Sequence, residues 1–137
     1  MEHIDHVGIA VRSLEDAVPL YRAILGAPPA GYETVSAEGV RVAFFGEGAG
    51  RVELLEPAGT DSPVGRFLER HGPGLHHVCL TVADLDAALE KARAAGAEPL
   101  PPGIRTGAEG SRVAFLHPRS AGGVLLELRE RSEATPP

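Results

Sequence analysis

The sequence predicts an α+β fold made of two pseudo-twofold-related βαβββ modules, and three internal repeats carry this prediction. Residues 6–17 read HVGIAVRSLEDA and residues 77–88 read HVCLTVADLDAA, so the second copy follows 71 residues after the first. RVAF at 41–44 recurs at 112–115 with the same offset, and VEL at 52–54 matches LEL at 126–128, 74 residues later. Three matched blocks in the same order indicate a duplicated unit. We expect the curved mixed sheets of the two modules to form one cleft.

The first module spans about residues 4–56 and begins with an alternating, β-branched segment that predicts a strand. Ser13 follows this strand and precedes an apolar helical stripe that ends at Gly26. Pro19 lies inside the stripe, so we expect an irregular first turn or a late start of the helix. Three short strands then complete the module, at about 31–36, 39–46 and 50–56.

The second module spans about residues 74–129 and repeats the same plan. A strand over 75–82 leads to Asp84, which we expect to cap the following helix, and Gly96 ends that helix. Three strands are predicted to follow, at about 97–101, 111–117 and 123–129.

Both modules are expected to share one domain of 137 residues, 1–137, which is long enough to bury a sizeable core. A linker over 57–73 joins them, and its segment 63–71 predicts a short helix. The tail, 130–137, is rich in polar residues and proline, so we expect it to be frayed.

Composition excludes several classes of protein. The formal net charge of −6 argues against nucleic-acid binding, because such binding needs a basic surface. No stretch approaches the ~20 apolar residues of a membrane span, and charged residues and histidine near the N-terminus do not resemble a signal peptide. The single cysteine, Cys79, rules out an internal disulfide and is compatible with a cytoplasmic location.

Two histidines and two glutamates occupy equivalent positions in the two modules: His6, His77, Glu53 and Glu127. If the modules pair about a twofold axis, these four side chains converge on one point. Two imidazoles and two carboxylates suit a divalent metal, here cobalt, manganese, nickel, zinc or magnesium. Four protein ligands leave octahedral positions open, which is typical of a catalytic site. A single strand histidine is usually structural, but recurrence at one repeat position favours ligation.

Strand alternation supports this site. His6 shares a strand face with Gly8 and Ala10, and His77 shares one with Cys79 and Thr81. The opposite faces carry bulky residues, which we expect to pack on the helices. Small side chains beside both histidines leave room for a substrate cavity.

Three further residues are weighed as contributors to the site. His117 follows a predicted strand, and together with Arg119 it is a candidate substrate contact. An exposed arginine is usually only solvated, and the same reading applies to Arg119. Cys79 has no base partner visible in the sequence, so we interpret it as a small packing residue.

The doubled plan with these histidines and glutamates resembles the vicinal oxygen chelate superfamily, and several stretches narrow the resemblance to its methylmalonyl-CoA epimerase family. The resemblance covers about residues 4–129. The stretches that carry it are Ile4-Asp5-His6-Val7, Leu25-Gly26, Val52-Glu53-Leu54-Leu55-Glu56-Pro57, Asp61-Ser62-Pro63-Val64, Phe67-Leu68, Gly74-Leu75-His76-His77-Val78, Phe115-Leu116-His117-Pro118 and Gly122-Gly123-Val124-Leu125-Leu126-Glu127-Leu128.

The resemblance implies an isomerase that interconverts the C2 epimers of methylmalonyl-CoA, a reaction of propionate metabolism. It implies metal-assisted abstraction of the α-proton through an enolate, with one divalent ion held by His6, Glu53, His77 and Glu127. It also implies a small acyl-CoA substrate and a homodimer.

The residues expected to transfer the proton depart from the family's pattern at one position. Glu127 is one acid/base of the family, whereas the glutamate that some members place two residues after a Gly-Val pair is Val42 here. Valine cannot transfer a proton, so the second group must be Glu53, a metal-bound water or His117, and we favour Glu53 as the second catalytic residue.

Two other functions fit the same superfamily. A glyoxalase-like lactoylglutathione lyase would use a similar ligand set, but the Asp61-Ser62-Pro63 linker argues against it. A non-enzymatic small-molecule-binding protein would tend to lose the metal ligands, whereas all four are present here.

Overall fold

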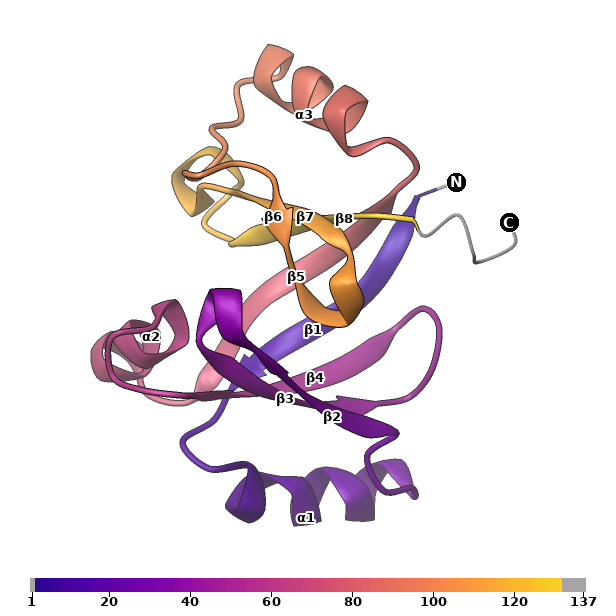
Figure 1. Cartoon of the computed structure of the whole chain (residues 1–137), viewed down its shortest axis with the longest axis vertical. Coiled ribbons are helices and arrows are strands. Elements are labelled where there is room, and N and C mark those ends of the chain that lie inside the picture. The colour runs from indigo at the N-terminus through magenta and orange to yellow at the C-terminus, as the bar shows by residue number, and fades with distance from the viewer. Residues whose placement is uncertain (1, 132–137) are drawn as a thin grey trace. The chain divides into compact units, whose positions relative to one another are not determined.

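A computed structural model describes residues 2–131 of the chain (Figure 1). Its internal contacts divide into two compact units, which we call the first unit (residues 6–76) and the second unit (residues 2–5 and 77–131). Each unit contains a mixed four-stranded sheet with a helix across one face, so the predicted α+β class and βαβββ plan are confirmed.

The first unit has its sheet in the order β2-β3-β4-β1, with β1 parallel to β4 and the other neighbours antiparallel. A second helix, α2, follows the sheet and coincides with the helix predicted in the linker. The elements are β1 (His3–Ala10), α1 (Leu14–Leu25), β2 (Gly31–Val35), a 3-10 turn η1 (Ser36–Glu38), β3 (Val40–Phe45), β4 (Arg51–Pro57) and α2 (Pro63–His71).

Helix α1 packs on one face of this sheet through its N-terminal two turns (Figure 1). Leu14 and Tyr21 contact the cluster that Phe45 and Leu54 form on the sheet. The last turn of the predicted apolar stripe does not join the core, since Ile24 is 72% exposed.

Pro19 disturbs α1 less than the sequence suggests. The helix begins at Leu14, directly after Ser13, whose hydroxyl accepts a hydrogen bond from the Asp16 N–H. The expected irregular first turn or late start is therefore wrong. Pro19 is exposed, and so is Glu15, the residue four positions earlier whose carbonyl loses its helical hydrogen bond.

The second unit has its sheet in the order β5-β8-β7-β6, with β5 parallel to β8. Helix α3 packs on it through an apolar stripe of Leu85, Ala88, Leu89 and Ala92. The elements are β5 (Gly74–Val82), α3 (Leu85–Ala94), β6 (Arg105–Thr106), η2 (Ala108–Gly110), β7 (Arg112–Leu116), η3 (Pro118–Ser120) and β8 (Leu126–Glu130). The tail expected to be frayed over 130–137 is wrong at its start, because Glu130 ends β8 and the Arg131 N–H donates to the Val82 carbonyl over 2.7 Å. The rest of that tail, 132–137, lies outside the described residues.

The strand predicted over 97–101 is wrong, and the second strand of this unit is instead the short β6. The predicted segment does run beside β7, where the Leu100 N–H donates to the Phe115 carbonyl over 2.8 Å. Pro99 makes only an isolated bridge, to Leu116. Three prolines within 99–102 lack the N–H groups that a regular ladder needs, so continuous pairing is limited to β6.

Both long helices begin against a carboxylate from the last strand of their own unit. The Leu14 N–H donates to Glu56 Oε1 and the Leu85 N–H to Glu130 Oε2, each over 2.9 Å. Glu56 and Glu130 are themselves repeat-equivalent, and a negative charge at a helix N-terminus is stabilising. No helix within residues 2–131 has a long enough apolar run to cross a membrane.

Candidate functional site

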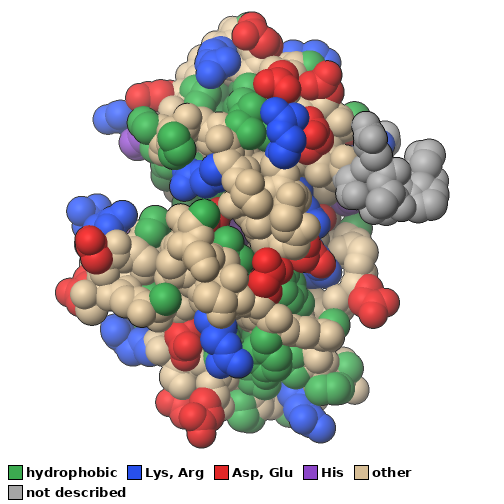
Figure 2. All heavy atoms as spheres, in the orientation of Figure 1, with side chains coloured by type: hydrophobic (Ala, Val, Ile, Leu, Met, Phe, Trp, Pro, Cys, Tyr) green, Lys and Arg blue, Asp and Glu red, His purple; other side chains and the backbone are tan. Residues whose placement is uncertain are grey.

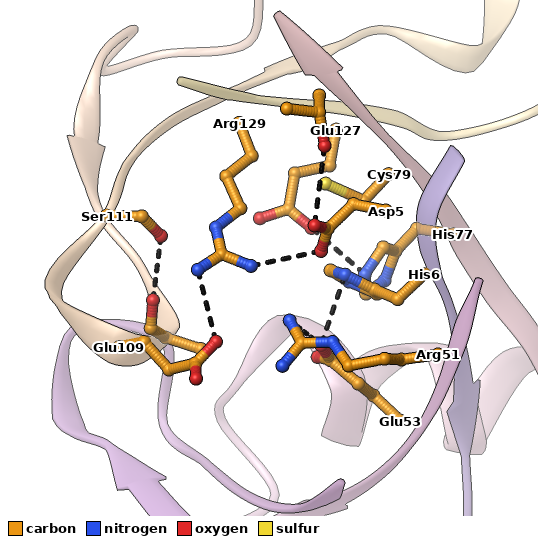
Figure 3. Close-up of polar contacts among 12 residues, drawn as sticks. Asp5, His6, Arg51, Glu53, His77, Cys79, Glu109, Ser111, Glu127 and Arg129 are labelled. Carbon is orange, nitrogen blue, oxygen red and sulfur yellow. Dashed lines mark hydrogen bonds and ion pairs between the residues drawn. The ribbon is translucent and has the colours of Figure 1, made fainter. Parts of the chain in front are cut away.

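The first unit places His6 and Glu53 side by side on adjacent parallel strands. Gly8 of β1 is paired with Glu53 of β4, so both strands turn these side chains to the sheet face opposite α1. We call this the histidine face of the first unit. His6 Nδ1 lies 3.1 Å from Glu53 Oε2, and both residues are buried, at 4% and 3% exposure (Figure 3).

A third charged side chain, Arg51, belongs to the same group. It is paired in register with His6, and its Nη2 lies 3.3 Å from Glu53 Oε2. Its guanidinium lies over the ring of Phe44, 5.4 Å from the centroid. Sequence reasoning missed Arg51, although its position two residues before Glu53 places it on the same strand face.

The second unit repeats the arrangement with its own pair. His77 Nε2 lies 3.1 Å from Glu127 Oε1, and both side chains are buried (Figure 3). Cys79 is paired with Glu127 as Gly8 is with Glu53 in the first unit. The ring of Phe115 meets His77 edge-on at 5.9 Å, and Phe115 is paired in register with Glu127.

The donor pairs fit a divalent metal. Two ligand atoms at right angles on an ion, with bonds of ~2.1 Å, lie about 3 Å apart, close to the separation in both pairs. Each unit therefore presents one buried imidazole nitrogen and one carboxylate oxygen at the spacing of neighbouring ligands. The convergence of both pairs on one ion stays a prediction.

The surroundings of the histidines follow the predicted alternation. Ala10 and Cys79 on the histidine faces are fully buried. The bulky residues of the opposite faces pack toward the helices, Ile9 in the α1 cluster and Leu80 in the α3 cluster. That part of the prediction is confirmed within each unit.

His117 and Arg119 lie together in the turn after β7. His117 is half-buried and its Nδ1 accepts a hydrogen bond from the Arg119 N–H over 3.0 Å, which closes the turn η3. The Arg119 side chain is exposed and pairs with Glu98 at 3.6 Å. These contacts give both residues a local structural role, and substrate contact by either remains a prediction.

A network of charged side chains around Arg129 was not predicted from the sequence. Arg129 lies two residues after Glu127 and bridges Asp5 at 3.0 Å and Glu109 at 3.1 Å (Figure 3). The Thr81 hydroxyl also donates to Asp5, which is buried. Glu109, the residue at the other end of the second ion pair, adopts a left-handed backbone with φ 59°.

A second acidic cluster lies at the start of α3, where side chains of both signs intermingle (Figure 2). Asp84, Asp86 and Glu130 offer carboxylate oxygens within metal-binding distance of one another. Arg112 already bonds Glu130 at 2.9 Å and Asp86 at 3.3 Å, and these bonds raise the pKa of its guanidinium. Arg112 thus already occupies oxygens of two of these three carboxylates, and we assign the cluster no metal.

The fold and this donor set define a class of protein, and comparison with known sequences agrees with it. Residues 5–115 match the pattern of the Glyoxalase/Bleomycin resistance protein/Dioxygenase superfamily. The chain belongs to that superfamily.

Relatives within the superfamily narrow the assignment. The chain is 39% identical to the mitochondrial methylmalonyl-CoA epimerase of Homo sapiens, over 93% of this chain and 73% of that protein. It is 40% identical to the ethylmalonyl-CoA/methylmalonyl-CoA epimerase of Cereibacter sphaeroides, over 93% and 96%. A solved methylmalonyl-CoA epimerase in complex with methylmalonyl-CoA and NH4+ superposes with a TM-score of 0.91 at 38% identity, covering 100% of this chain and 99% of that one. The protein is thus a member of the methylmalonyl-CoA epimerase family.

Proposed function

We propose that the protein interconverts the C2 epimers of methylmalonyl-CoA by metal-assisted abstraction of the α-proton. The observation that carries this proposal is the buried His–Glu pair at the equivalent place in each unit of a chain from the epimerase family. The pairs combine nitrogen and oxygen donors with burial, which suits a metal-assisted proton transfer.

His6, Glu53, His77 and Glu127 would hold the ion, and cobalt, manganese, nickel, zinc and magnesium all accept such donors. When bound, the ion supplies Lewis acidity that stabilises the negative charge developing on the thioester oxygen. The chain's own part is to keep four donors buried and correctly oriented. Gly8 supports this role in the first unit, since a residue without a side chain pairs with Glu53.

Two carboxylates would move the proton. Glu127 serves one face of C2 and Glu53 the other, because epimerisation needs removal of a proton from one side and its return on the opposite side. Val42 is buried on the neighbouring strand β3, where it pairs with Leu55, and its side chain has no group that exchanges a proton. His117 is the weaker candidate, since its Nδ1 is engaged by the Arg119 N–H.

The proposal also includes a homodimer and a cytoplasmic location. Among the candidate ions we choose cobalt for the assays. Resemblance to the superfamily favours the dimer, and the buried single Cys79 is compatible with a reducing compartment. Light scattering of the purified full chain measures the first of these directly.

The test is solvent exchange at C2. The cobalt-loaded protein is incubated with one epimer of methylmalonyl-CoA in deuterium oxide, and the products are followed by mass and by chirality. We expect one deuterium per molecule and conversion to the mixed epimers. Absence of both would contradict the proposed activity. The hemithioacetal of methylglyoxal and glutathione serves as the competing substrate, and we expect no turnover of it.

A matched pair of histidine variants tests the metal site. His6→Ala should abolish both cobalt retention and exchange, because it removes a buried ligand. His3→Ala is the control, since His3 lies exposed on the same strand. Equal cobalt content in the two variants would remove His6 from the ligand set.

A further inference from the structure

One arginine of the first unit is buried, whereas most of the arginines in the chain are exposed. Arg51 is 9% exposed and lies on the histidine face, opposite His6 in the register of β1 and β4. The position that the repeat makes equivalent in the second unit is Leu125. The fold therefore accepts an apolar residue at this place, and the buried charge needs another reason.

The contacts of Arg51 direct its charge toward the proposed ligands. Its Nη2 is 3.3 Å from Glu53 Oε2, and the same oxygen is 3.1 Å from His6 Nδ1. Stacking over Phe44 at 5.4 Å keeps the guanidinium from leaving the sheet surface. Burying a guanidinium is costly unless it is paired, and here one partner is a proposed metal ligand.

Charge counting shows what this cation changes. A divalent ion and the carboxylates of Glu53 and Glu127 sum to zero. Methylmalonyl-CoA brings a free carboxylate to the reacting end, and a second negative charge develops on its thioester oxygen when the proton leaves. The ion and its two carboxylates carry no net charge together, and Arg51 adds one positive unit that attracts both negative charges of the substrate more strongly.

We propose that Arg51 is a specificity residue, which offsets the charge of Glu53 and thereby selects thioesters whose acyl group carries a free carboxylate. This inference rests on the proposed function. It distinguishes malonyl-type thioesters from simple acyl-CoA compounds that lack the carboxylate. Arg51 acts through the charge of the centre, so this preference in binding depends on the summed charge of residues 51 and 53 more than on their chemical identity.

The test compares the affinities of methylmalonyl-CoA and propionyl-CoA, which lacks the carboxylate, by calorimetry on the cobalt-loaded full chain. Racemic methylmalonyl-CoA is used, so turnover does not change its composition. Arg51→Met should weaken methylmalonyl-CoA binding about 30- to 100-fold, as expected for one unit charge acting over ~6–8 Å at an effective dielectric constant of ~20. Propionyl-CoA binding should change by less than about 3-fold, because its acyl group carries no charge.

Two further variants separate charge from contact. Arg51→Met combined with Glu53→Gln has the summed charge of the parent protein, so its preference for methylmalonyl-CoA should return to within about 3-fold. Arg51→Lys keeps the charge and should keep most of the preference. Arg41→Met is the matched control, since Arg41 is exposed on the other face of the neighbouring strand and stacks on Tyr32.

Cobalt content and melting temperature are measured for every variant, and Arg51→Lys and the double variant carry the test if Arg51→Met does not fold. The inference is overturned if Arg51→Met keeps the parent's preference, if both ligands weaken equally, or if the double variant stays as weak as Arg51→Met. A parent protein that neither binds methylmalonyl-CoA nor exchanges its C2 proton contradicts the proposed function instead. The two failures are therefore distinguishable.

Discussion

Replacing Glu53 by glutamine separates two roles that one carboxylate is proposed to fill. Glu53 is 3% exposed and its Oε2 contacts both His6 and Arg51. Glutamine has nearly the same shape and keeps one carbonyl oxygen as a metal ligand. It loses the negative charge and the capacity to accept a proton at neutral pH. Metal binding should therefore survive the change while proton transfer should not.

The structure sets the size of both effects. Loss of the charge removes one partner of the buried ion pair between Arg51 and Glu53, and removing one partner of such a pair costs about 3–5 kcal/mol. We expect metal-free Glu53→Gln to lose stability in that range. General acid–base groups contribute about 10²- to 10⁴-fold, so epimerisation should slow by that factor, about 3–5 kcal/mol on the barrier.

The assay follows each epimer separately in deuterium oxide, with cobalt content measured on the same sample. If Glu53 serves one face of C2, its removal should block proton loss from one epimer, whereas the other should exchange without inverting. Glu127→Gln should show the opposite preference. Glu53→Gln that retains cobalt and turns over both epimers at the parental rate would refute the assignment and direct attention to His117.

A compensating variant checks the same reasoning. Val42 pairs with Leu55, two residues after Glu53 on the same strand face. Adding Val42→Glu to Glu53→Gln returns a carboxylate to that face, so part of the lost activity should come back. No recovery in a folded, cobalt-loaded double variant would show that a carboxylate at this position cannot reach C2.

Three other predictions concern stability. Chelation should lower the melting temperature and added cobalt should restore it, because a ligand that binds only the folded chain stabilises it; an unchanged melting curve would argue against the metal. Leu54→Ala should cost about 2–5 kcal/mol in denaturant titrations, since Leu54 is fully buried against α1, whereas Ile24→Ala should change stability by less than ~0.5 kcal/mol. Glu56→Ala should cost about 1–2 kcal/mol by removing the acceptor at Leu14 N, and the exposed Glu47→Ala should have little effect, so equal losses would contradict the capping role.

Much of the fold could be predicted from the sequence because its signals are local. The repeat of strand and helix patterns predicted both units, α2 was predicted with its observed bounds, and Asp84 caps α3 as expected. Alternation along β1 and β5 correctly separated the faces that pack on helices from the histidine faces. These features depend on neighbouring residues, whose backbone geometry sets which side chains share a face.

Where the strands pair was decided by the tertiary structure. The segment 97–101 has a strand-like composition, yet three prolines deprive it of donors and β6 forms the ladder instead. Likewise Pro19 was expected to disturb α1, but its exposed position makes it tolerable. In both cases the outcome depends on which backbone groups meet a partner or water, and that is known only once the elements have packed.

The same division holds for the site. Repeat position alone selected His6, Glu53, His77 and Glu127, and the structure shows a 3.1 Å contact within each unit's pair. The sequence analysis did not identify Arg51 as part of the site. Its contact with the site depends on the parallel pairing of β1 with β4, which places Arg51 opposite His6, 45 positions earlier in the chain. Helix capping by Glu56 and Glu130 was missed for the same reason. A sequence determines which side chains share a strand face, but a charge acquires its partner only when distant strands come into register, because electrostatic contacts act through space and not along the chain.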